Sequence, residues 1–188
     1  MAVVTQSFGA ALRTFGWLAL AAGLVLVSAQ VLPARAQSGP DLPTGSVSGL
    51  PLPRFVSLKA DRVNVRQGPN KDQDVRWVYT RSGMPVEITA EYENWRRIRD
   101  WEGAEGWVYH SLLSGRRTAV VVPTLKDEPV TLHDAPDPEA PVVAKLEGGV
   151  LGSLKSCSGT WCLFTGKGFE GYIRQERLWG AYPNETVE

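Results

Sequence analysis

The 188-residue chain has only two cysteines and two histidines, so it offers little material for a metal site or a catalytic array. It also lacks an excess of either charge, because 20 basic residues balance 20 acidic ones. General nucleic-acid-binding proteins are normally basic, which argues against that class. Hydrophobic residues make up 43% of the chain and charged residues 21%, as in globular proteins of one or two domains.

Residues 1–36 have the composition of an export signal. They contain two arginines and no acidic residue, and residues 17–27 are apolar or small throughout. The segment ends in Ala-Arg-Ala at 34–36, and an Ala-x-Ala end is typical of a signal-peptide cleavage site. The alternative is a membrane anchor, but the uninterrupted apolar run is shorter than the roughly 20 residues that span a bilayer. We expect cleavage after Ala36, a periplasmic or secreted protein, and membrane contact only before cleavage.

Residues 37–53 have the composition of a flexible linker. Four prolines fall in this segment with glycine and serine between them, and no period in it would bury one face. From residue 54 onward, short runs rich in valine, isoleucine, tryptophan and tyrosine alternate with turn residues, without a long helical pattern. This pattern predicts an all-β fold of short antiparallel strands. In the first half the expected strands are 63–66, 75–79, 86–90, 95–99 and 106–109.

The strand pattern recurs after about 65 residues. The segment VRQGP at 65–69 is echoed by LHDAP at 132–136, and Trp95 is echoed by Trp161. The offset drifts from 67 to 65 along the chain, which indicates loop-length differences within one repeated unit. A unit of this length with five short strands fits a small barrel, an arrangement that limits exposed sheet edges.

The first unit resembles the bacterial SH3-like domain family. The resemblance is carried by VNVRQGP at 63–69, the central Trp95, GWV at 106–108 and the leucine pair at 112–113. The second unit matches in order and spacing, so the resemblance covers about 55–182. It implies a module that binds cell-wall material or peptides, and it carries no catalytic residue.

The repeat and the resemblance together predict two tandem SH3-like barrels. We expect the first domain over 54–122 and the second over 123–183, followed by a tail at 184–188. Residues 118–122 are expected to form the closing strand of the first domain. Residues 180–182 would take the same place in the second domain.

Cys157 and Cys162 are five positions apart and bracket a turn-like sequence. In a hairpin with a four-residue loop they would face each other across two strands, a placement that suits a disulfide. Export favours oxidation. A redox pair or two free thiols are the alternatives, but redox sites favour a tighter Cys-x-x-Cys at a helix start. We therefore predict a structural disulfide, with an ion pair between Glu91 and Arg96 at the corresponding place in the first domain.

Aromatic residues are concentrated in the first unit, and their flat rings suit stacking on sugars or holding a peptide. Trp107 and its counterpart Tyr172 are expected to pack in the cores. Trp101 stands between two acidic residues, which places it in a surface turn, and two arginines on the preceding strand should be exposed opposite Ile98. Packing in the core is the alternative for the other rings. The candidate ligand-binding residues are Tyr92, Trp95, Arg97, Arg99 and Trp101.

The remaining chemistry of the chain is sparse. His110 and His133 are single and far apart, and the sequence has no nucleophile motif and no phosphate loop. We expect no metal, no cofactor and no enzymatic activity. Residues 54–117 carry 12 positive and 9 negative charges, a net of +3, and residues 118–188 carry 6 and 10, a net of −4. The basic first unit would steer an acidic partner, or the opposite charges would favour docking of one unit on the other. The alternative is that these are two solvated surfaces that differ in charge.

These features predict an exported, non-enzymatic binding module that recognises peptidoglycan or peptide ligands in the periplasm. The alternative is a structural or accessory module that contacts proteins of an envelope complex and has no affinity for glycan. Neither function involves nucleic acid.

Overall fold

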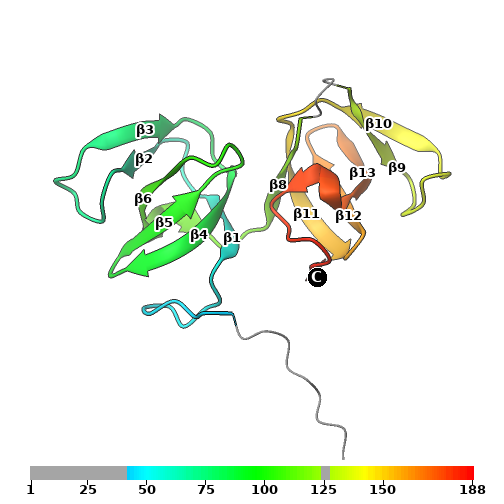
Figure 1. Cartoon of the computed structure of the whole chain (residues 1–188). Helices are drawn as coiled ribbons and strands as arrows, with labels where there is room; N and C mark the ends of the chain where they lie inside the picture. The colour runs from blue at the N-terminus through cyan, green and yellow to red at the C-terminus, as the bar shows by residue number, and fades with distance from the viewer. Residues whose placement is uncertain (1–41, 124–127) are drawn as a thin grey trace, which may run out of the picture. The chain divides into compact units, whose positions relative to one another are not determined.

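Short β-branched and aromatic runs between turn residues form two antiparallel sheets, as the sequence predicts (Figure 1). The computed structural model describes residues 42–123 and 128–188, which belong to one compact unit of the chain. The signal peptide predicted for residues 1–36 lies outside the described residues. Besides strands and turns, the described residues contain two 3-10 helices, η1 (His110–Leu112) and η2 (Gln175–Arg177). No helix in this part of the chain is long and apolar enough to cross a membrane.

The first sheet has seven strands in the order β3-β2-β6-β5-β4-β1-β7. It curls around a core of buried aliphatic side chains, among them Val63, Ile98 and Val108. Each strand predicted for this half is present to within two residues. The strands are β1 (Arg54–Leu58), β2 (Val63–Arg66), β3 (Val75–Tyr79), β4 (Pro85–Tyr92), β5 (Trp95–Arg99), β6 (Glu105–Tyr109) and β7 (Leu113–Ser114).

The second sheet repeats this order strand for strand, as β10-β9-β13-β12-β11-β8-β14, with β15 added beside β11. Its core includes Leu132, Phe164 and Ile173, all fully buried. The common strand order confirms the internal repeat. The strands are β8 (Thr118–Val121), β9 (Val130–His133), β10 (Val142–Leu146), β11 (Leu151–Ser158), β12 (Trp161–Gly166), β13 (Phe169–Arg174), β14 (Leu178–Trp179) and β15 (Thr186–Val187).

Strand β8 belongs to the second sheet, so the prediction that 118–122 closes the first domain is wrong. It pairs with β11 and β14, just as β1 pairs with β4 and β7 in the first sheet. All four residues of β8 are buried, and a continuous apolar run does not indicate which sheet it joins. The two sheets are therefore divided at about residues 115–117, and β8 is the first strand of the second domain rather than the last of the first.

The described part of the predicted linker, residues 42–53, forms a hydrogen-bonded turn. Thr44 and Pro51 form an isolated bridge, and the amide of Gly45 donates to the carbonyl of Leu50 at 2.8 Å. The carboxylate of Glu91 in β4 accepts hydrogen bonds from the amides of residues 47 and 48 and is paired with Arg54 at 2.7 Å. This segment is thus attached to the first sheet by Glu91 and by Leu52, which packs against the core, and its composition does not reveal these contacts.

The predicted tail is also part of the fold. Strand β15 extends the second sheet by pairing Val187 with Cys157, and no strand forms at 180–182. The carboxylate of Glu185 accepts hydrogen bonds from Arg117 at 2.7 Å and from the amide of Tyr182 at 2.8 Å. These bonds lower the pKa of Glu185 against the opposing effect of its burial.

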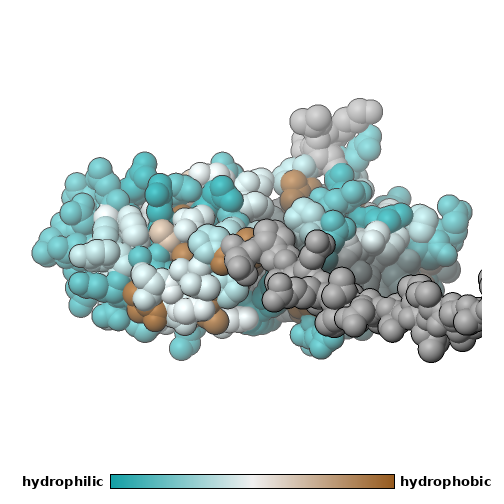
Figure 2. All heavy atoms as spheres, turned by 60° about the horizontal axis from the view of Figure 1, so that its bottom comes forward, coloured by the Kyte–Doolittle hydropathy of each residue, from teal (hydrophilic) through white to brown (hydrophobic). Residues whose placement is uncertain are grey.

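Residues of the two sheets are in contact. The hydroxyl of Tyr182 donates to the carboxylate of Glu87 in β4 at 2.8 Å. The ring of Phe55 packs edge-on against Trp179, with 5.1 Å between the ring centroids. The face drawn in Figure 2 is mostly hydrophilic, and its hydrophobic residues form small separate patches.

Candidate functional site

Strand β5 carries most of the predicted site residues on one face. Ile98 points into the core and is fully buried, whereas the side chains of Arg97 and Arg99 are 48% and 43% exposed. Strand alternation places Trp95 on the same outer face as these two arginines. This arrangement agrees with the sequence-based expectation that the arginines lie opposite Ile98.

The structure does not bring all five candidates together. Tyr92 and Trp95 are cross-strand partners at one end of β5, whereas Trp101 lies in the turn beyond its other end, roughly 20 Å farther along the chain. Arg97 is paired with Glu105 at 2.5 Å. Arg99 is hydrogen-bonded to Glu87 and lines a different hollow. Tyr92 and Trp95 therefore remain as one site, and the other three lie outside it.

Trp101 is half-buried and lies in a turn that a buried carboxylate organises. Asp100 is only 6% exposed and accepts hydrogen bonds from the amides of Glu102 and Ala104. It also accepts from the hydroxyl of Tyr79 at 2.7 Å, and burial together with this contact raises the pKa of Tyr79 above its usual value. The turn thus has a local structural explanation.

Trp107 and Tyr172 lie on the outer faces of their sheets, so the prediction that they are core residues is wrong. In β6 the buried residues are Gly106 and Val108, and the ring between them is half-buried. Position 106 faces inward, and a β-carbon there would lie 2.4 Å from Val65 Cγ1. Only a glycine at this position lets β6 approach β2 so closely. The period-2 alternation then directs Trp107 outward.

Two adjoining hollows border Trp95 and share Lys71, Trp95 and Tyr109 among their lining residues. We call them together the aromatic groove. One hollow, of about 290 Å³, extends to Arg66 in β2, and the other reaches Tyr92. The groove therefore contains the two predicted residues Tyr92 and Trp95 together with four basic or aromatic residues that sequence reasoning did not select, Arg62, Arg66, Lys71 and Tyr109. Two acidic residues, Asp72 and Glu93, also line its second hollow.

The rings of the groove differ in exposure. Trp95 is 8% exposed and packs edge-on against Tyr109, with 5.5 Å between the ring centroids. Tyr92 is 53% exposed, and Lys71 Nζ lies 6.0 Å from the centroid of the Tyr109 ring. Tyr109 follows Trp107 by two positions, so strand alternation places both rings on the outer face of the sheet. This alternation was the signal in the sequence that could have identified Tyr109.

The loop that borders the groove is held by local hydrogen bonds. The guanidinium of Arg66 donates to the carbonyl of Gln73 at 2.6 Å, and the side chain of Asn70 accepts from the amide of Asp72 at 3.1 Å. On the opposite side, the amide of His110 donates to the carbonyl of Asn94 at 2.9 Å, which fixes the start of η1 next to the rings. The groove is thus formed before any ligand arrives, which lowers the entropic cost of binding.

The second domain has a counterpart of this groove, lined by Thr131, His133, Trp161 and Arg174. Trp161 corresponds to Trp95, and Arg174 takes the position of Tyr109. The guanidinium carbon of Arg174 lies 4.4 Å from the centroid of the Trp161 ring. The chain's own cation therefore occupies a face of this tryptophan, and the two grooves differ in chemistry although they match in position.

The two histidines do not form a site together. His133 Nδ1 lies 2.8 Å from the carbonyl of Ala140, so it carries the hydrogen, and Nε2 accepts from the hydroxyl of Thr131 at 3.1 Å. His110 is exposed at the start of η1. In residues 42–123 and 128–188, no group of three or more metal-ligating side chains is placed to hold a metal ion.

The predicted disulfide between Cys157 and Cys162 is confirmed. The two cysteines are cross-strand partners in β11 and β12, and their sulfurs are 2.06 Å apart. Both belong to the buried core of the second domain, where a redox partner has no access. At the same place in the first domain, Glu91 pairs with Arg96 at 3.3 Å, as expected.

Two curled antiparallel sheets of the same strand order, each with a 3-10 turn before its short closing strand, define a tandem of small SH3-like domains. The model of the bacterial SH3 domain family matches residues 59–115 and 126–180, which together make up more than half of the chain. The chain therefore belongs to the bacterial SH3 domain family, and the resemblance seen in its sequence is confirmed.

Comparison with curated proteins gives no match. Among solved structures, the chain is similar to NlpC2 from Trichomonas vaginalis, with 11% identity, a TM-score of 0.31, and 68% of this chain and 48% of that one covered. It is also similar to NlpC1 from the same organism, with 13% identity, a TM-score of 0.32, and 72% and 48% covered. The chain thus spans about half the length of these proteins, and similarity at this level does not bear on its function.

Proposed function

We propose that the protein is an exported, non-enzymatic binding module whose ligand, a peptidoglycan or peptide segment, lies in the aromatic groove of the first domain. The observation that carries this proposal is the grouping of Tyr92, Trp95 and Tyr109 with Arg66 and Lys71 in one preformed groove. Membership of a binding-domain family supports it. The signal-like segment 1–36 and the disulfide support a periplasmic location.

The groove suits a ligand with a flat apolar surface and a negative charge. Trp95 and Tyr109 meet edge-on beneath the groove, and the exposed ring of Tyr92 offers a flat surface on which a sugar ring or a proline can pack. Three basic side chains, Arg62, Arg66 and Lys71, outnumber the acidic Asp72 and Glu93 in the lining, so cationic donors are available to carboxylates of the ligand. Peptide stems and sugars of the cell wall offer both features.

A second candidate function is favoured by the edges of the sheets. Strands β3 and β10 each stand at one end of their sheet, and their exposed valines are Val75, Val142 and Val143 at 42%, 50% and 50%. Exposed apolar side chains on an edge strand suit the addition of a strand from another protein. This observation supports an accessory module of an envelope complex without affinity for glycan.

Co-sedimentation with purified peptidoglycan sacculi tests the proposal. Tyr92→Ala and Lys71→Gln should each weaken retention about fivefold or more, because central ring and cation contacts are typical binding hot spots. Trp101→Ala is the matched control, since it removes an aromatic ring outside the groove. Both groove residues lie at the surface, so melting temperatures should remain close to that of the unaltered protein.

Absence of sacculus retention would overturn the cell-wall ligand. A photo-crosslinker placed at Val75 or Val143 that captures a defined envelope protein, with no sacculus binding, would establish the accessory function instead. Equal loss in Tyr92→Ala and Trp101→Ala would mean that the aromatic groove is not the binding site.

A further inference from the structure

The tip of the hairpin formed by β4 and β5 carries two cross-strand pairs that belong to different contacts. Tyr92 pairs with Trp95, and both line the aromatic groove. In the adjoining pair, Glu91 with Arg96, the carboxylate binds residues 44–51, which we call the amino-terminal turn. None of these described residues lines either hollow of the groove. The turn can therefore act on the groove only through the hairpin.

Glu91 is bonded to the turn and to the sheet at the same time. Its side chain has no exposed surface, and it accepts hydrogen bonds from the amides of Val47 and Ser48 at 3.1 and 2.9 Å. The hydroxyl of Ser48 donates to it at 2.6 Å. Its Oε1 also pairs with Arg54 at 2.7 Å and with Arg96 at 3.3 Å. A buried carboxylate that loses such donors is destabilised, so Glu91 has to reorganise when the turn is displaced.

Arg96 links the Glu91 carboxylate to the tip of the hairpin. Its guanidinium donates to the carbonyls of Glu93 and Trp95 at 2.8 and 2.9 Å and pairs with Glu91 through Nε. These carbonyls flank the two-residue turn that sets the position of Trp95 against Tyr92. Glu93 has a φ of 46°, a left-handed conformation that is unfavourable for a residue with a β-carbon. The hairpin tip therefore depends on the bonds that Arg96 supplies.

The second domain holds the same hairpin covalently. Its disulfide occupies the place of the Glu91–Arg96 pair. Gly159 stands at the place of Glu93, and its positive φ of 89° is readily adopted by glycine. The hairpin of the second domain is thus held without outside help, whereas that of the first relies on a buried ion pair and on the amino-terminal turn.

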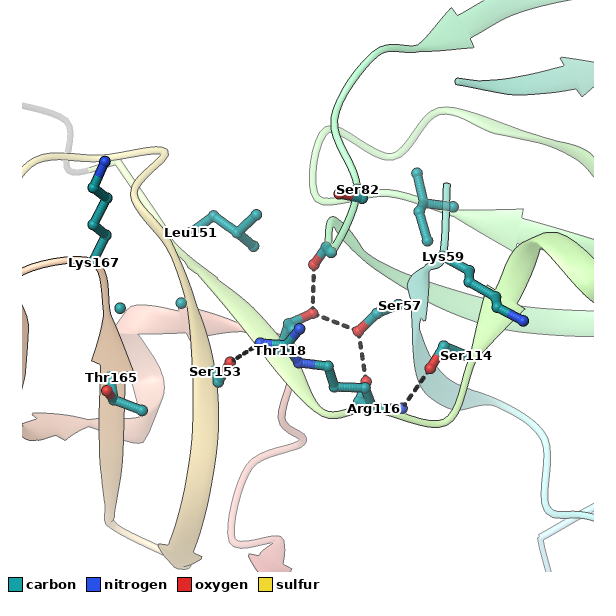
Figure 3. A pocket seen from close by; sticks show the side chains of 14 residues that line it. Ser57, Lys59, Ser82, Ser114, Arg116, Thr118, Leu151, Ser153, Thr165 and Lys167 are labelled. Carbon is teal, nitrogen blue, oxygen red and sulfur yellow. Dashed lines mark hydrogen bonds between the residues drawn. The ribbon is translucent and has the colours of Figure 1, made fainter. Parts of the chain in front are cut away.

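Strand β1, which follows the turn in the chain, is also fixed at its other end. There the hydroxyl of Ser57 donates to the carbonyl of Arg116 at 2.5 Å, and the hydroxyl of Thr118 donates to the carbonyl of Gly83 at 2.6 Å (Figure 3). Ser57 and Thr118 are buried, so these bonds are shielded from water. Detaching the turn should therefore loosen the hairpin and leave β1 and the core of the first sheet in place.

We propose that the amino-terminal turn controls the aromatic groove. Docked on Glu91, it holds Tyr92 and Trp95 in the geometry that binds a ligand, and when it detaches the hairpin loosens and the groove loses affinity. Glu91 and Arg96 are the positioning residues that connect the two. Docking of the turn and binding of a ligand then strengthen each other. This inference rests on the proposed function, because it concerns the same groove.

The variant Gly45→Val tests the proposal without changing the hairpin. Gly45 is buried, and a β-carbon there would overlap the carboxylate of Glu91. Because Arg54 and Arg96 hold this carboxylate from the other side, the added side chain has to push the turn away. The matched control is Ser46→Val, which places the same side chain at the neighbouring, exposed position of the turn.

Two measurements follow the effect. The first needs no ligand: in NMR spectra, Gly45→Val should shift the indole N–H resonance of Trp95 and speed hydrogen exchange of the His110 amide, which is bonded to the hairpin tip. The amide of the fully buried Ile98 should keep its protection. The second is sacculus co-sedimentation, in which Gly45→Val should weaken retention about fivefold or more, the lower end of typical coupling between sites. Ser46→Val should match the unaltered protein in both.

A cross-link separates control through the hairpin from a general loss of stability. Glu91→Cys with Arg96→Cys removes the acceptor of the turn but copies the disulfide of the second domain at the same cross-strand place. Glu91→Ser with Arg96→Ser removes the acceptor and adds no bond. The cross-linked protein should retain sacculi about fivefold or more better than the serine variant, because its hairpin is held without the turn.

The proposal is overturned if Gly45→Val leaves both the Trp95 resonance and the exchange of the His110 amide unchanged. It is also overturned if the cysteine and serine variants retain sacculi equally. If the unaltered protein does not bind sacculi at all, the cell-wall ligand is wrong, and the ligand-free spectra still decide whether the turn controls the groove.

Discussion

Arg174 covers a face of the Trp161 ring at the position where the first domain has Tyr109. The two grooves arise from the same repeated unit, yet one presents a tyrosine to a ligand and the other fills the space with its own guanidinium. Under the proposed function, this difference favours the first domain as the one that binds the ligand. It also suggests a direct exchange of the two residues as a test.

Tyr109→Arg should lower sacculus retention about fivefold or more, because a cation–π contact with Trp95 would occupy the aromatic groove. Arg174→Tyr should have the opposite effect in the second domain and raise retention. Retention assays with both variants check this prediction. If Tyr109→Arg binds sacculi as well as the unaltered protein, the second domain or another surface must hold the ligand.

The disulfide should stabilise the second domain to a limited extent. Replacing both Cys157 and Cys162 by serine should lower the free energy of unfolding by about 2 kcal/mol, since the loop that the bond closes is short. Denaturant unfolding measures this loss, and non-reduced peptide mapping of periplasmic protein should find the two cysteines joined. A variant that fails to fold at all would show that the bond contributes more than loop closure.

Glu91 should make the stability of the first domain depend on acid pH. Its burial opposes ionisation, but hydrogen bonds from Ser48 and Arg54 lower its pKa from 4.5 to about 2. A lowered pKa in the folded state means that this stabilisation is complete above about pH 4.5 and is lost as the pH falls toward 2. Thermal melts of the unaltered protein should therefore show a decline in this window.

The variant Glu91→Gln should melt at a lower temperature at neutral pH and decline less below pH 4.5. Glu105→Gln is the control, because Glu105 forms a more exposed pair with Arg97 and should change the melting temperature little. An acid profile that is the same with and without the Glu91 carboxylate would show that other groups cause the decline.

Export should leave a defined amino terminus. Mass spectrometry of the periplasmic protein should find residue Gln37 first, either unmodified or cyclised to pyroglutamate, because residues 34–36 form the predicted cleavage site. Membrane-bound protein that retains Met1 would instead indicate an anchor helix.

Local patterning predicted the strands of this protein but not the partners of each strand. The alternation around Ile98 placed Arg97 and Arg99 correctly on the outer face. The same alternation was overlooked at Trp107, where size and hydrophobicity suggested the core although Gly106 and Val108 fill it. A tryptophan can cover the outside of a small sheet, so its identity alone does not fix its direction.

The sequence predicted only part of the candidate site, again because it does not show which distant segments of the chain meet. Tyr92 and Trp95 are neighbours in one hairpin, so a short stretch of sequence was enough to select both. Lys71 and Tyr109 reach the same groove from a loop and a strand far away in sequence. Their approach depends on the pairing of β2 with β6, which is a property of the tertiary fold.

The position of β8 decides how the two domains can be separated. A cut at residue 123 would leave the first fragment with an apolar strand whose partners β11 and β14 are missing, and the second fragment with an open gap between them. Unpaired apolar strands of this kind promote aggregation. A cut after Ser114 keeps both sheets whole, because β7 ends there and β8 begins at Thr118. Each domain of this protein therefore starts one strand before its most recognisable sequence motif.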